Sequence, residues 1–110
     1  MPPSSPTPVC SGALQCEAMW IEAAEAVSAV SGMALRLASD QVLETFAPLG
    51  PTYYPRMHGR VLKTPVGPEM YEFNASFRCG AYCRAHEIAA LGRFNERVNA
   101  AGAPYATARD

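Results

Sequence analysis

The stretch CEAMWIEAAEAVSAVSGMALRLA, residues 16–38, carries the strongest structural signal in the chain. At about 100° per residue, its apolar side chains, including Trp20 and Val27, fall on one broad arc, whereas Glu22 lies on the other side. This pattern predicts a long amphipathic helix. Its many alanines let another backbone approach closely, and Gly32 is expected to bend or end it.

A short second helix is predicted at residues 40–46. Ser39 is a favourable N-cap residue before an acidic first turn, and Pro48 and Gly50 terminate the segment. The segment DQVLETF contains no Lys or Arg that would contact phosphates. A DNA-binding helix-turn-helix is therefore disfavoured.

A β-hairpin is predicted from strands at residues 57–63 and 71–77. In the second strand Tyr71 and Phe73 alternate with polar residues, so the aromatic side chains share one face. The connection TPVGP fits a type I turn with Pro65 at its second position. Because a single hairpin is marginally stable in water, this aromatic face must pack on helices or pair with another chain.

One more helix is predicted in the last third of the chain. It begins at about Ser76 or Arg78 and runs to Ala101, where Gly102 and Pro104 mark its end. Its larger apolar side chains form one flank of the helix, and internal glycines weaken it.

Both ends of the chain are predicted to be irregular. Residues 1–15 are rich in Pro, Ser and Thr, which favours an extended tail, held by something outside the domain if it is ordered. Residues 102–110 form a second, irregular tail. The fold class is therefore α+β: one small domain at residues 16–101, with a long amphipathic N-terminal helix, a short second helix, a β-hairpin and a C-terminal helix.

Composition and charge exclude several classes of protein. The chain has 110 residues, 9 Lys plus Arg against 10 Asp plus Glu, and a formal net charge of -1. Scattered basic residues in near-neutral balance argue against nucleic acid as a main partner. The longest apolar stretch, residues 18–37, is interrupted by charged residues, so no membrane span is expected. No phosphate-binding loop is present, and no small-molecule substrate is identified.

The four cysteines are Cys10, Cys16, Cys79 and Cys83. The N-terminus lacks the basic and apolar regions of a secretory signal, which predicts an intracellular, cytoplasmic location or a place within a virion or other large assembly. In a reducing compartment free thiols are favoured over disulfides or metal ligands.

Cys79, Cys83 and His86 form the most specific chemical pattern. On a helix these three side chains would project from one face within two turns, as metal ligands or a redox pair require. A fourth ligand at a diagnostic spacing is missing, and cysteines often serve as small core residues. Core cysteines are therefore the favoured interpretation, a metal site is the alternative, and no cofactor is expected.

The function that fits this sequence best is a non-enzymatic structural or accessory subunit. Its hydrophobic share of 49% owes much to alanine, which predicts a thin core and dependence on protein partners in a homo- or hetero-oligomer, for example a virion or multiprotein complex. One alternative is a small Cys/His metal-binding or thiol-redox protein, and another is a regulatory protein with a single partner. The candidate interface residues are Trp20, Tyr53, Tyr54, Tyr71 and Phe73.

Overall fold

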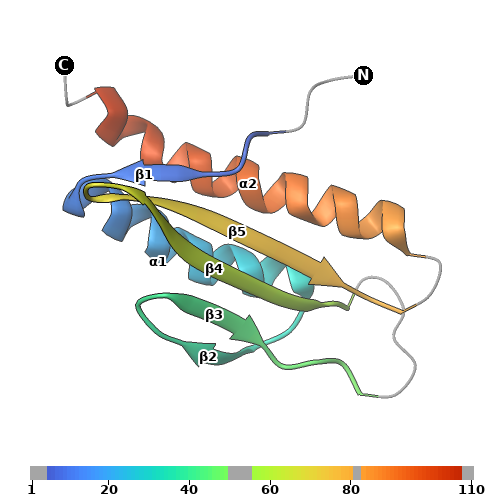
Figure 1. Cartoon of the computed structure of the whole chain (residues 1–110). Helices are drawn as coiled ribbons and strands as arrows, with labels where there is room; N and C mark the ends of the chain where they lie inside the picture. The colour runs from blue at the N-terminus through green and yellow to red at the C-terminus, as the bar shows by residue number, and fades with distance from the viewer. Residues whose placement is uncertain (1–4, 50–55, 81–82, 108–110) are drawn as a thin grey trace.

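The fold is an antiparallel sheet covered on one face by two helices (Figure 1). The computed structural model describes residues 5–49, 56–80 and 83–107. Its five strands lie in the order β1-β5-β4-β3-β2. The predicted α+β class is confirmed at this level. The elements are β1 (Val9–Ser11), α1 (Ala13–Ser31), β2 (Leu35–Ala38), β3 (Val42–Thr45), β4 (His58–Gly67), β5 (Met70–Arg78) and α2 (Arg84–Thr107).

Helix α1 confirms the first predicted helix, with different ends. It stops at Ser31 because Gly32 adopts a left-handed conformation, with φ of 73°, and donates its N–H to the Ser28 carbonyl. The segment that was expected to continue the helix forms β2 instead, which begins at Leu35. The apolar residues after Gly32 are too few to distinguish the spacing of a helix from that of a strand. The helix ends at Gly32, so this segment forms a strand.

The predicted second helix at residues 40–46 is wrong, because this segment forms part of the turn after β2 and then strand β3, which pairs with β2. Ser39 does bind the backbone N–H groups that follow it: its Oγ accepts hydrogen bonds from Gln41 at 3.3 Å and Val42 at 3.1 Å. Those bonds close a turn rather than a helix. The buried side chains of Leu43 and Thr45 then alternate with half-buried neighbours, as a strand with one covered face requires.

The β4–β5 hairpin confirms the predicted strands, but its turn lies elsewhere. Pro65 is within β4, next to an irregularity in the register with β5, and Pro68 and Glu69 form the turn. Glu69 has φ of 56°, in the left-handed region that non-glycine residues seldom adopt. Pro65 therefore lies in strand β4 beside a bulge at the end of the sheet, instead of in the turn.

The core lies between the sheet and the helices. Phe73 of β5 is fully buried, and its ring packs edge-on against Trp20 of α1, with 5.2 Å between centroids. Phe77 meets Phe94 of α2 at 6.0 Å. The aromatic face of the hairpin is thus covered by helices of the same chain, which is one of the two outcomes expected from the sequence.

Helix α2 begins later than predicted, at Arg84, and continues past the expected end. Gly102 lies inside the helix, where an added Cβ would come within 2.8 Å of Met19 Cγ. Its carbonyl accepts a hydrogen bond from Gln15 Nε2 at 2.9 Å. Close packing against α1 therefore extends the helix through Gly102 and Pro104, and residues 102–107 are helical rather than an irregular tail.

The described part of the N-terminal segment is held by its own domain. Asn95 and Asn99 of α2 donate side-chain hydrogen bonds to the carbonyls of Ser5 and Pro6, at 3.3 and 2.9 Å. Pro8 is fully buried, and its carbonyl accepts the N–H of Phe73 at 2.9 Å. The expected tail at residues 1–15 therefore includes β1 and the start of α1.

The contact between α1 and β4 predicts the effect of adding one methyl group. A Cβ on Gly59 would lie 2.8 Å from Val27 Cγ2, so Gly59→Ala should lower the free energy of unfolding by about 1–3 kcal/mol. Gly92→Ala is the matched control: it has open space around it within α2 and should raise stability by about 1 kcal/mol. Urea denaturation of both variants measures the difference. Equal stability of the two variants would contradict the close packing.

Candidate functional site

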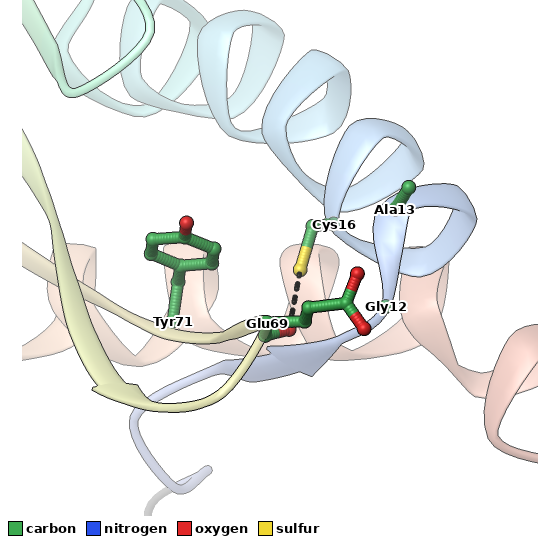
Figure 2. A pocket seen from close by; sticks show the side chains of 5 residues that line it. All are labelled: Gly12, Ala13, Cys16, Glu69 and Tyr71. Carbon is green, nitrogen blue, oxygen red and sulfur yellow. Dashed lines mark hydrogen bonds between the residues drawn. The ribbon is translucent and has the colours of Figure 1, made fainter.

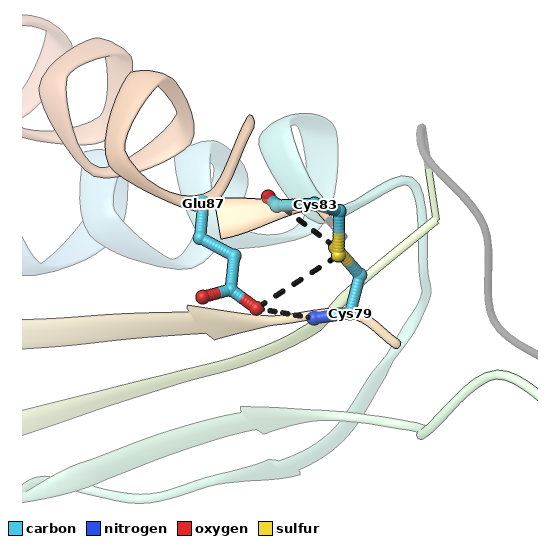
Figure 3. Close-up of side chains that lie close together, drawn as sticks. All are labelled: Cys79, Cys83 and Glu87. Atoms are coloured by element: carbon cyan, nitrogen blue, oxygen red, sulfur yellow. Dashed lines mark hydrogen bonds between the residues drawn. A yellow bond between two sulfur atoms is a disulfide. The ribbon is translucent and has the colours of Figure 1, made fainter. Parts of the chain in front are cut away.

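The most chemically distinctive site joins the end of β5 to the start of α2 (Figure 3). Cys79 directly follows β5, Cys83 directly precedes α2, and the two are joined by a disulfide. Glu87, in the first turn of α2, accepts the N–H of Cys79 at its Oε2 over 2.9 Å. The same oxygen lies 4.0 Å from Cys83 Sγ. The two sulfurs and a carboxylate oxygen of Glu87 all lie within 4.8 Å of one another.

All four cysteines are paired, contrary to the expectation of free thiols. The second disulfide joins Cys10 of β1 to Cys16 of α1, whose Cα atoms are 5.0 Å apart. Both pairs are close in sequence, and each disulfide links a strand or the residue after it to the helix that follows or the residue before it. Disulfides are typical of oxidising compartments, whereas the intracellular location remains a prediction.

The structure brings Glu87, rather than His86, to Cys79 and Cys83. The predicted helical face required all three residues to share one helix, but α2 begins only at Arg84. Cys79 therefore lies at the end of a strand, and the angular spacing calculated for a helix does not apply to it. His86 is exposed on α2. The signal for Glu87 was its place four residues after Cys83, one helical turn away.

A charged cluster occupies the face of the sheet opposite the helices. Glu44 of β3 accepts a hydrogen bond from Arg36 at 2.6 Å and lies 2.8 Å from His58 Nε2. The hydrogen bond from Arg36, followed by that from His58, lowers the pKa of Glu44 below its ordinary value. Arg60 pairs with Glu44 in the strand register, and Arg78 pairs with His58. This end of the face is consequently rich in arginine.

Beside the charged cluster the same face carries apolar side chains. Val42 of β3 is directly opposite Leu62 of β4, which is 38% exposed. Leu37 of β2 pairs with Glu44 and is 41% exposed. These three residues, Leu37, Val42 and Leu62, are called the apolar strip below. Neither helix covers them, since both helices pack on the other face (Figure 1).

The described residues line hollows at two places in the domain, among others. One, of about 200 Å³, lies at the start of α1 and is lined by Gly12, Ala13, Cys16, Glu69 and Tyr71 (Figure 2). Cys16 is bridged there and offers no thiol for catalysis. The other, of about 400 Å³, lies beside β3, where Met33 and Phe46 supply apolar walls and Arg56 a charge. Neither hollow places a nucleophile beside a general base within the described lining.

The predicted interface residues have different surroundings. Phe73 is buried in the core, so it is unsuited to an interface. Trp20 is half-buried, donates its Nε1–H to the Ser39 carbonyl at 2.9 Å, and lies under Lys63 Nζ, as does Tyr71. Both therefore contribute to packing within the domain. The remaining candidates, Tyr53 and Tyr54, lie outside the described residues.

The fold and the site define a small α+β domain with a half-covered antiparallel sheet and a disulfide at the β5–α2 junction. Comparison with known proteins gives no match to a family model, to a curated protein or to a solved structure. Among the described residues, neither helix has the length and hydrophobicity needed to cross a membrane.

The Arg36–Glu44 contact predicts that the pKa of Glu44 depends on Arg36. Arg36→Ala should raise the pKa of Glu44 towards its ordinary value of 4.5, because the largest cause of the lowering is removed. Since the pKa is lowered in the folded state, ionised Glu44 stabilises the fold above 4.5, and this contribution is lost as the pH falls through the lowered value. A carboxyl-detected NMR titration measures it.

The control for this titration is Arg97→Ala, which removes the separate ion pair between Arg97 and Glu22. It should leave the pKa of Glu44 unchanged. An identical Glu44 titration in the wild type and the Arg36→Ala variant would show that the 2.6 Å contact does not hold in solution.

Proposed function

We propose that this protein is a non-enzymatic structural or accessory subunit that binds other protein chains through the open face of its sheet. The observation that carries the proposal is the apolar strip, in which Leu37 and Leu62 are exposed and Val42 is half-buried, on a face that neither described helix covers. Apolar residues in the middle with polar and arginine residues around them are the composition of a protein interface. The charged cluster at Glu44 forms one part of that surrounding rim.

The size of the open face supports a protein partner. Adjacent strands lie roughly 4.8 Å apart, and a strand of nine or ten residues is roughly 30 Å long. The sheet has two long strands, β4 and β5, and three strands of three or four residues, so it presents roughly 500 Å². A standard interface buries about 800 Å² on each partner. The face is large enough to supply most of one such interface.

Further apolar side chains are exposed on the helical side. Leu14 and Ile21 of α1 are 73% and 58% exposed, and Ile88 of α2 is 59% exposed. In an assembly such as a virion or multiprotein complex, a subunit can contact more than one neighbour, with a different side of the domain facing each. A regulatory protein with one partner is the alternative, and it differs from the subunit in stoichiometry.

Leu62→Lys tests the proposal, because it places a charge in the centre of the apolar strip. Native mass spectrometry of the wild-type protein from its source should show an oligomer or a co-purifying chain. The variant should bind its partner about tenfold more weakly or worse, because an unpaired charge is costly to bury in the centre of an interface. Its thermal unfolding should change little because Leu62 is partly exposed.

The matched control is Leu49→Lys, because Leu49 is 96% exposed after β3 and lies outside both the apolar strip and the helical side of the domain. It should retain the contacts made by the sheet. A wild-type protein that is monomeric and without a bound chain would contradict the proposal, as would equal loss of association in both variants.

A further inference from the structure

We propose that reduction of the Cys79–Cys83 disulfide creates a binding site for a thiophilic divalent cation such as Zn²⁺. The ligands are the two cysteine thiolates and the carboxylate of Glu87. This inference is independent of the proposed function, because it concerns the β5–α2 junction and its test measures metal rather than bound chains.

The three ligand groups are held in place by bonds that do not involve the disulfide. Cys79 follows β5, whose last residue, Arg78, pairs with His58 of β4. The Cys83 carbonyl accepts the N–H groups of His86 and Glu87, each at 3.0 Å, which begins the helical turn. The carboxylate of Glu87 in turn accepts the Cys79 N–H. Reduction therefore leaves the backbone around the sulfurs anchored at both ends.

A tetrahedral zinc site requires the two bonded sulfurs to move apart, whereas one sulfur is already near the spacing it needs from the Glu87 carboxylate. With Zn–S of about 2.3 Å and Zn–O of about 2.1 Å, the ligand atoms are separated by about 3.8 Å for two sulfurs and about 3.6 Å for sulfur and oxygen. Cys83 Sγ already lies 4.0 Å from Glu87 Oε2. Once the sulfur–sulfur bond is broken, the two sulfurs repel to about the separation that the metal requires.

Charge and access also favour a cation here. Two thiolates and one carboxylate give three negative charges, which exceed the charge of Zn²⁺ by one, and the positive end of the α2 dipole partly offsets the remainder. Cys83 is nearly buried, but Cys79 is half-buried and Gly80 is exposed, so a cation can approach from the junction. Three protein ligands leave a fourth position for water or an external ligand.

The chemistry balances with an external dithiol as reductant. The dithiol gives up two electrons and two protons and becomes a cyclic disulfide, while the Cys79–Cys83 bond breaks and each sulfur gains a proton. Binding of Zn²⁺ then releases those two protons, because the thiolate is the metal ligand. Oxidation by a disulfide of the same class reverses both steps and expels the metal.

The test is a Zn²⁺ titration in competition with a chromogenic chelator, with oxidised and with dithiol-reduced protein under anaerobic conditions. The reduced protein should bind one equivalent of Zn²⁺ and the oxidised protein none. Replacing Zn²⁺ with Co²⁺ should give a sulfur-to-cobalt charge-transfer band.

Glu87→Gln should weaken Zn²⁺ binding by about tenfold or more, and its amide oxygen still accepts the Cys79 N–H, so the fold is retained. His86→Ala is the matched control and should bind like the wild type.

Peptide mapping of the reduced wild type provides a readout without variants. Zn²⁺ should slow alkylation of Cys79 and Cys83 and leave the alkylation of Cys10 and Cys16 unchanged, because among the described residues only the first pair has a third ligand nearby. Protection of Cys10 and Cys16 instead would overturn the assignment. So would equal binding by oxidised and reduced protein, or loss of binding in His86→Ala but not in Glu87→Gln.

Discussion

The structure depends on one apolar layer between the inner face of the β4–β5 hairpin and the two helices. Phe73 and Phe77 project from β5 into this layer, where Trp20 and Phe94 cover them. Because large side chains are few, the layer is filled only if the backbones approach closely. Gly59 makes this possible, since any side chain there would displace Val27 of α1. The thin core predicted from the alanine content is thus compensated by short distances between elements.

The sequence predicted the elements whose periodicity is long and regular, namely α1 and the β4–β5 hairpin. It failed at residues 40–46 because Ser39 forms the same side-chain-to-backbone hydrogen bonds in a turn as in a helix cap, and a short segment does not separate the two. It also failed at the end of α2. There Gly102 and Pro104 are signals for a helix end, but tertiary packing against Met19 outweighs them.

The candidate site was predicted in part, for a similar reason. Cys79 and Cys83 were identified from their spacing, but the third ligand depended on where the helix begins, which sequence fixes least well. With α2 starting at Arg84, the residue one turn after Cys83 is Glu87, and Glu87 rather than His86 joins the two sulfurs in one cluster. Hydrogen bonding of Glu87 to the Cys79 N–H is a contact between a strand end and a helix, and no periodicity encodes it.

The two cysteine pairs also differ in what their reduction would change. Each closes a short loop, so in the chain-entropy model each contributes about 2 kcal/mol, against about 5–15 kcal/mol for a typical domain. Cys79 is half-buried and packs against the edge of the core, and Cys83 is 5% exposed, whereas Cys10 is fully buried within the core. Loss of the Cys79–Cys83 disulfide would therefore leave most of the stability of a typical domain. The β5–α2 junction could then change from the disulfide to the proposed metal-bound state while the domain stays folded. Since Cys79 follows Arg78 at the arginine-rich end of the open face, such an exchange would occur beside the surface proposed to bind partners.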